Sequence, residues 1–256
     1  MIGDLDSTSQ PLIEHLTELR KRVLWSVVIM LIGTGICYHF RDDIYGFLVK
    51  PLADAMGPED SQRLIYTNLT EAFFTYVKVS IFAGCFLTFP FLATQIWMFI
   101  SPGLYKREKA AMLPFLIAAP IMFFLGGALV YYIVIPGAWK FFLSFQSSGS
   151  ETVLPIMLEA KVSDYLDLIM VLIFAFGLAF QMPVILALMA KAGIISAEWL
   201  AAKRRYAIVL IFIVAAIITP PDIISQIALA IPLMILYEIS ILLIRRSSKK
   251  PNANTP

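Results

Sequence analysis

One stretch decides the fold of this chain: residues 110–135, AAMLPFLIAAPIMFFLGGALVYYIVI, which contain no charged side chain. A helix needs about 20 mostly apolar residues to cross the roughly 30 Å of bilayer hydrocarbon. This stretch is long enough, and it is too long and too apolar for a strand. The rest of the chain is similar, since 59% of its residues are hydrophobic, only 15% are charged and the mean hydropathy is +0.81. The composition therefore predicts an integral membrane protein.

Further apolar segments bring the predicted spans to six, in an all-α fold. Three more are long: 22–40, 73–100 and 165–190. The last apolar region is interrupted by Thr219-Pro220-Pro221-Asp222, whose prolines lack backbone donors and disfavour helix just before them. We interpret it as a hairpin of two short helices, 206–219 and 223–244, the first covering only about 21 Å. The sequence does not distinguish a spanning hairpin from a re-entrant one.

Basic residues are distributed unevenly between the loops. With six spans, fourteen of the twenty lysines and arginines lie on the side that holds both termini. Cytoplasmic loops carry the excess of basic residues, so we predict that both termini are cytoplasmic. The outside loops, 41–72 and 136–164, mix prolines and glycines with apolar residues, which predicts structured caps that partly rest on the membrane surface. One membrane domain, 1–246, and a cytoplasmic tail, 247–256, account for the chain.

Several classes of function are excluded at this stage. A net charge of +2 is too small for a nucleic-acid-binding face. His15 and His39 fall at opposite ends of one predicted helix, so they cannot form a close metal pair. Protease, hydrolase and nucleotide-binding motifs are missing. We expect no enzyme activity, no metal and no cofactor, and we expect Cys37 and Cys85, inside apolar runs, to be buried thiols.

Two carboxylates lie among basic residues at predicted cytoplasmic ends of spans. Glu18 belongs to HLTELRKR, residues 15–22, and Glu108 belongs to a charged elbow, SPGLYKREK, residues 101–109. Guanidinium groups bind carboxylates through paired hydrogen bonds, so a surface with both glutamates would prefer arginine to lysine in a peptide. The alternative is local charge balance, in which Glu18 pairs with Lys21 or Arg22 at helical spacing. The residues alone leave both readings open.

Intramembrane polar residues raise a different alternative, a secondary transporter or channel for a small solute or ion. The candidates are Gln95, Gln181, Gln226 and Glu238. Gln181 lies near Pro183, so its amide is equally suited to satisfy backbone groups freed by a kink. A transporter would depend on these polar groups, whereas a peptide receptor would depend on the cytoplasmic carboxylates.

Four separated motifs give the chain a resemblance to a known family. They are PLIEHLTELRKR at 11–22, QIWMFISPGLY at 95–105 with the charged elbow, FGLAFQMP at 176–183, and the TPPD turn at 219–222. The chain resembles the TatC family, the multispanning core of the twin-arginine protein translocase, over nearly its whole length. The resemblance implies a receptor in the bacterial inner membrane for signal peptides with paired arginines. It further implies export of folded cargo by the proton-motive force, with TatA- and TatB-type single-span proteins and other copies of the chain as partners.

The resemblance also implies roles for single residues. Glu18 and Glu108 match the family's cytoplasmic carboxylates implicated in signal recognition. The same surface or elbow holds Arg20, Arg22, Phe99, Tyr105 and Lys106.

Other matching positions imply assembly or later transport steps. Pro51, Asp222 and Gln226 are of this kind, although Asp222 is equally suited to cap the helix after it. Gln181 departs from family members that carry an intramembrane glutamate. We therefore expect Gln181, like Gln95, to make a polar contact with a partner helix.

Overall fold

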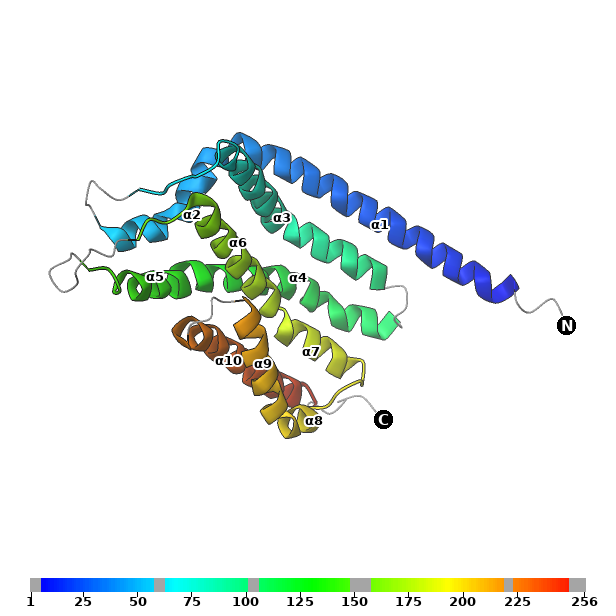
Figure 1. Cartoon of the computed structure of the whole chain (residues 1–256). Helices are drawn as coiled ribbons and strands as arrows, with labels where there is room; N and C mark the ends of the chain where they lie inside the picture. The colour runs from blue at the N-terminus through cyan, green and yellow to red at the C-terminus, as the bar shows by residue number, and fades with distance from the viewer. Residues whose placement is uncertain (1–5, 58–62, 101–105, 148–157, 219–222, 249–256) are drawn as a thin grey trace. The chain divides into compact units, whose positions relative to one another are not determined.

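The computed structural model of the chain is helical in the residues that it describes (Figure 1). It describes residues 6–57, 63–100, 106–147, 158–218 and 223–248, and the side chains of 13–57, 63–99, 114–147, 158–218 and 226–246. Within these ranges no strand forms, and an isolated β-bridge pairs Ile65 with Lys161. The predicted all-helical fold class is confirmed.

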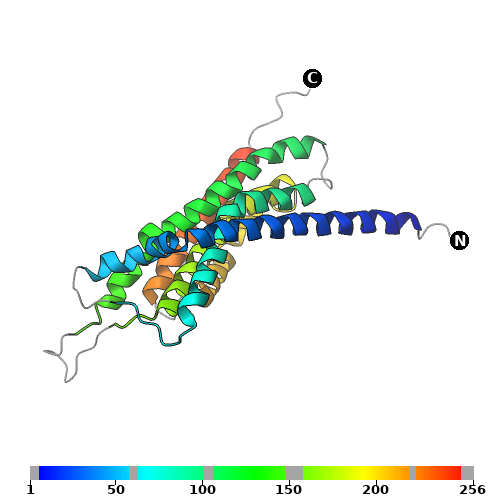
Figure 2. The same ribbon diagram turned by 90° about the horizontal axis from the view of Figure 1, so that it is seen from above.

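The helices follow one another along the chain with mostly short connections. Figure 2 shows α1 as one continuous helix. A π-helical segment, η2, continues α4 into α5. The bounds are α1 Asp6–His39, α2 Arg41–Met56, α3 Glu71–Ile100, α4 Lys106–Leu129, η2 Val130–Val134, α5 Ile135–Leu143, α6 Val162–Ala179, α7 Met182–Lys191, α8 Ala197–Ala202, α9 Arg204–Ile218 and α10 Ile223–Ser248.

Five of the described segments are long and apolar enough to cross a membrane, and each overlaps a predicted span. They are Ile13–His39, Glu71–Phe99, Pro114–Leu143, Val162–Lys191 and Gln226–Arg246. The remaining prediction, 206–219, corresponds to α9, whose 15 residues cover about 22 Å and make it short, as expected. The same expectation is wrong for α10, which has 26 residues. The basic pair Arg245 and Arg246 lies in its last turn, where cations stabilise a helix end.

Three boundaries differ from the predicted ones for local reasons. α1 begins well before residue 22, because polar residues extend a helix beyond the hydrocarbon without ending it. The third span runs past Ile135 because the wider π-helical turn of η2 relieves the clash between a proline ring and the preceding carbonyl, here at Pro136. The fourth span is divided into α6 and α7. The division falls just before Pro183, which lies in the first turn of α7, where proline is tolerated.

The chain divides into two compact units. The first comprises Met1–Ile44 and Tyr76–Pro120, and the second comprises Tyr45–Thr75 and Ile121–Pro256. The single membrane domain 1–246 with a tail at 247–256 stays a prediction.

In the first unit, α1 and α3 cross at small residues. A methyl group placed on Gly84 of α3 would lie 2.6 Å from the backbone nitrogen of Thr34 on α1. One placed on Gly33 would lie 2.8 Å from the Cγ2 atom of Thr88. Glycine is therefore required for this close approach, which is a common way for membrane helices to pack.

In the second unit, α6 contributes several buried side chains to the core. Leu166, Ile169 and Phe176 are fully buried, as is Phe123 of α4. α4 and α6 meet at another glycine contact, since a methyl group on Gly126 would lie 2.6 Å from the Phe176 carbonyl oxygen. The predicted outside loop 41–72 contains α2. Hydrogen bonds from Tyr131 and Tyr165 attach α2 to the core of this unit.

A separate cluster joins α8 and α10 in the second unit. Ala197, Leu200, Tyr237, Ile241 and Ile244 are buried together. The Tyr237 hydroxyl donates a hydrogen bond of 2.8 Å to the Leu200 carbonyl. This bond holds the short helix α8 against α10, next to the start of α9.

Candidate functional site

The predicted carboxylate Glu18 forms an ion pair within its own helix. Its Oε1 atom accepts a hydrogen bond of 3.1 Å from Nη2 of Arg22, one turn further along α1. The side chains of Glu18 and Arg22 are 31% and 28% exposed, so the pair is neither buried nor fully solvated. The local pairing considered from the sequence is therefore present, and Glu18 is a carboxylate already bound to a guanidinium group.

Arg22 also connects α1 with the end of α3. Its Nη1 atom donates to the Sδ atom of Met98 at 3.4 Å. Among the residues whose side chains the structure describes, its buried Nε atom has no hydrogen-bond partner, and neither has the buried Oε1 atom of Gln95, one turn before Met98. A thioether is a weak acceptor and an unpaired buried donor is costly, so Arg22 is held less firmly than a fully bonded arginine.

His15 stacks on Phe99 in the same region. The ring centroids are 4.4 Å apart and the planes are inclined by 20°. His15, Glu18 and Arg22 are spaced by three and four residues, which places them on one face of α1. The Thr34 and Gly84 crossing fixes the antiparallel register that brings this face to Met98 and Phe99.

Arg20 does not join this group. It lines a shallow depression of about 370 Å³ on another face of α1, together with Lys21, Leu24 and Trp25. Residues two positions apart in a helix are separated by slightly more than half a turn, so Glu18 and Arg20 point in nearly opposite directions.

Four predicted residues lie outside what the structure describes. Tyr105 and Asp222 are outside the described residues, and Lys106 and Glu108 begin α4 without described side chains. A joint site of Glu18 and Glu108 therefore stays a prediction.

The predicted intramembrane contacts are local in this structure. Nε2 of Gln181 lies 3.5 Å from the carbonyl oxygen of Gly177, one turn back. In a regular helix that carbonyl would accept from the Gln181 backbone N–H, which bonds instead to Leu178. The amide therefore satisfies backbone freed at the break before Pro183.

Two other polar candidates also have protein partners. Nε2 of Gln226 donates to the carbonyl oxygen of Phe212 at 3.2 Å and joins α10 to α9. Glu238 accepts two hydrogen bonds from Arg204, of 2.6 and 2.9 Å, in a half-exposed pair. Hydrogen bonding to Glu238 and the negative charge of Glu238 raise the pKa of Arg204 above its usual range.

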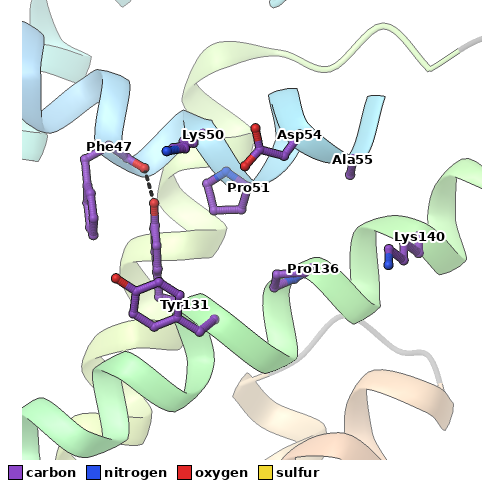
Figure 3. Close-up of a pocket in the computed structure, with 9 residues that line it drawn as sticks. Phe47, Lys50, Pro51, Asp54, Ala55, Tyr131, Pro136 and Lys140 are labelled. Carbon is purple, nitrogen blue, oxygen red and sulfur yellow. Dashed lines mark hydrogen bonds between the residues drawn. The ribbon is translucent and has the colours of Figure 1, made fainter. Parts of the chain in front are cut away.

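Pro51 is buried inside α2 and lines a cavity of about 510 Å³ (Figure 3). The cavity lies between α2 and the η2 and α5 segments. Its wall is fixed by Tyr131, whose hydroxyl donates to the Phe47 carbonyl at 2.7 Å and whose ring stacks on the Phe47 ring at 4.2 Å.

The sequence reading missed Glu71, an organising residue of the second unit. Its carboxylate accepts from the backbone N–H groups of Thr67, Asn68 and Ser163 at 3.0, 3.3 and 3.4 Å, and Lys161 lies 3.6 Å away. Glu71 thus joins the start of α3 to the start of α6. A glutamate in the first turn of a helix, after Thr67 and Asn68, is a recognisable capping signal, but the contact with Ser163 is not visible in the sequence.

Comparisons with known proteins agree with the resemblance found in the sequence. The profile of the family described as Sec-independent protein translocase protein (TatC) matches residues 14–232. The chain is 52% identical over 240 residues to the Sec-independent protein translocase protein TatC of Magnetococcus marinus, covering 94% of this chain and 86% of that protein. It is 47% identical to the protein of the same name from Rickettsia prowazekii, covering 90% of both chains.

Solved structures show the same relationship. A crystal structure of the twin-arginine translocase receptor TatC superposes with a TM-score of 0.77 at 38% identity, covering 92% of this chain and 100% of that one. A second crystal structure of that receptor, in the detergent DDM, also gives a TM-score of 0.77, covering 90% and 99%. Sequence and fold together show that this chain belongs to the TatC family and is a membrane component of the twin-arginine protein translocase.

Proposed function

We propose that this translocase component is the receptor for twin-arginine signal peptides. Its location is the bacterial inner membrane, its chain crosses six times with both termini cytoplasmic, and folded cargo is exported by the proton-motive force. The excess of lysine and arginine at the predicted cytoplasmic ends supports this orientation. The remainder of the proposal concerns how the first unit recognises the signal.

The contact between Glu18 and Arg22 carries the proposal. Its geometry demonstrates that a guanidinium group fits the Glu18 carboxylate at 3.1 Å. Both side chains are partly exposed, so an incoming arginine can reach the carboxylate from solvent. Signal binding then exchanges one guanidinium for another and leaves no carboxylate unpaired, which avoids the cost of desolvating a bare charge.

The surroundings favour arginine over lysine. Charge-assisted hydrogen bonds from a planar guanidinium can reach both carboxylate oxygens, whereas an ammonium group acts as a point charge. Met98 and the stacked ring of Phe99 supply a polarizable apolar surface next to Glu18, suited to the apolar residues of a signal. Glu108 is the third residue of α4, which begins soon after α3 ends, and we assign the second signal arginine to it.

Partner contacts belong to the same proposal. TatA- and TatB-type single-span proteins and further copies of the chain pack against the spans, with Pro51, Gln95, Gln181, Asp222 and Gln226 at or near these contacts. The short helix α9 supports this assignment. Its 15 residues are too few to cross the hydrocarbon core, so part of the bilayer thickness beside it is open to a partner helix.

The test is photocrosslinking from Phe99 to a signal peptide added to membranes that contain the full chain. We expect strong crosslinks with an Arg-Arg peptide and weak ones with Lys-Lys. Glu18→Gln should remove the difference, because an amide keeps the shape and loses the charge. A crosslinker at Leu87, which is 62% exposed on the same helix, measures contact not specific to the site.

The matched control variant is Glu238→Gln, which removes another partly exposed carboxylate bound to an arginine. It should leave crosslinking from Phe99 unchanged. Equal crosslinking of the two peptides, or no effect of Glu18→Gln, would mean that Glu18 only balances the charge of Arg22. Either result would refute the assignment of this surface as the signal-peptide receptor.

A further inference from the structure

The cavity beside Pro51 is lined by charged side chains, Lys50, Asp54 and Lys140, to which the proposed receptor function assigns no role. Figure 3 shows Lys50 and Asp54 along α2 and Pro136 and Lys140 along α5. The cavity that these residues line has a volume of about 510 Å³. This volume is within the roughly 300–1,000 Å³ typical of small-molecule sites. We infer that the cavity binds the phosphate headgroup of an anionic phospholipid, with Lys50 and Lys140 as its cationic ligands.

The cavity is preformed. The Tyr131 hydrogen bond to Phe47 and the parallel stacking of their rings, at an interplanar angle of 4°, fix α2 against η2. A buried hydrogen bond of 2.9 Å from Tyr165 to the carbonyl of the adjacent residue, Leu48, holds the same turn of α2 to α6. A ligand therefore meets walls that are already in place and loses little free energy to ordering them.

Its position matches the height of lipid headgroups. Lys140 lies three residues before the end of the candidate span Pro114–Leu143. Tyr132 and Ile133, on the same segment, are 69% and 67% exposed, as expected for side chains that face acyl chains. Tyrosine is enriched at membrane interfaces, and lysine extends its ammonium group from apolar surface toward headgroups.

The charges of the cavity favour an anionic ligand. Lys50 and Lys140 contribute two positive charges and Asp54 one negative charge, which leaves an excess of one positive charge. Within the part of the chain that the structure describes, neither lysine forms an ion pair. Their ammonium groups are thus available for a phosphate, while Tyr132 and Ile133 contact the chains attached to it.

Binding of phosphatidylglycerol to the purified full-length protein in a non-ionic detergent, counted by native mass spectrometry, tests this site. We expect phosphatidylglycerol to bind more tightly than phosphatidylcholine with the same chains. Lys50→Gln with Lys140→Gln should weaken phosphatidylglycerol binding by roughly fivefold for each lysine, the ordinary effect of one basic residue near a lipid surface. Lys191→Gln with Lys203→Gln, which removes the same charge elsewhere, should have no such effect.

Asp54→Asn tests whether the ligand of the cavity is negatively charged. If the ligand is anionic, loss of the carboxylate should tighten phosphatidylglycerol binding, whereas weaker binding would mean that the negative charge of Asp54 does not oppose the ligand and would overturn the inference. Equal affinity for the two lipids, or equal weakening by both lysine pairs, would also overturn it. Displacement of the lipid by equimolar glycerol phosphate would identify a site for soluble phosphate and refute the lipid assignment.

Discussion

The crossing of α1 and α3 can be tested by the addition of one methyl group. In Gly84→Ala, the new Cβ atom would lie 2.6 Å from the backbone nitrogen of Thr34 and 2.7 Å from its Cα atom. Favourable contacts between such atoms occur at about 3.5–4.0 Å, so the helices must separate by roughly 1 Å. These two atoms belong to the backbone, so rotation of the Thr34 side chain, whose Oγ1 atom would also lie 2.7 Å away, does not relieve the clash.

The cost can be estimated from the same geometry. Overpacking of this kind costs about 1–3 kcal/mol, and a backbone contact belongs in the upper part of that range. The gain in helix propensity from glycine to alanine offsets about 0.8–1.0 kcal/mol. We therefore expect Gly84→Ala to lower the free energy of unfolding by about 1–2 kcal/mol.

Gly35→Ala is the matched control on the partner helix. Beyond its own helical backbone, no atom in the described part of the chain lies within 4 Å of the added methyl group, so only the propensity gain remains. The two variants should differ by about 2–3 kcal/mol, or roughly 30- to 150-fold in the unfolding equilibrium.

The chain supplies its own reporter for this measurement. Cys37 on α1 is 3% exposed, so its reaction with a thiol-reactive fluorophore reports loss of the packing that buries it. Thermal unfolding in detergent should begin at a lower temperature for Gly84→Ala than for the parent chain or Gly35→Ala. A melting temperature for Gly84→Ala equal to or above that of Gly35→Ala would refute the close crossing.

Three further substitutions have different expected outcomes. Tyr165→Phe leaves the buried Leu48 carbonyl without its hydrogen bond and should cost about 1–3 kcal/mol in the same unfolding assay; an unchanged melting temperature would contradict that bond. Glu71→Gln should speed amide hydrogen exchange at Thr67 and Ser163, because a neutral amide accepts their N–H groups less strongly, and unaltered exchange would argue against this role. Glu238→Gln should leave the melting temperature unchanged, since exposed ion pairs contribute little, so a large fall would show that the pair is structural.

The membrane helices could be predicted from the sequence because hydropathy is a local property. The uncharged run at 110–135 was sufficient to identify its span, and the prolines at 220 and 221 separated α9 from α10. Helix ends were less predictable. The third span was predicted to end at residue 135, and the hydrogen-bond pattern of η2 explains why the helix continues through Pro136.

The site was predictable in its residues and not in its contacts. The spacing of Glu18 and Arg22 made their ion pair one of two expected outcomes. The contact of Arg22 with Met98, 76 positions later, depends on the register between two helices. Gly33 and Gly84 set that register, and they do not differ in the sequence from glycines such as Gly35 that meet no neighbour.

The π-helical turn η2 has a consequence for the phase of the helix that contains it. Its i→i+5 bonds accommodate one residue more than an α-helical turn would, so side chains after it are rotated by roughly 100° from where an uninterrupted α-helix would place them. Gly126 before the turn faces α6, and Lys140 after it faces the cavity beside α2. Deletion of a single residue from η2 would leave the contact of Gly126 with α6 in place and turn Lys140 away from the cavity beside α2. The extra residue of η2 therefore allows one continuous helix to contact two different neighbours.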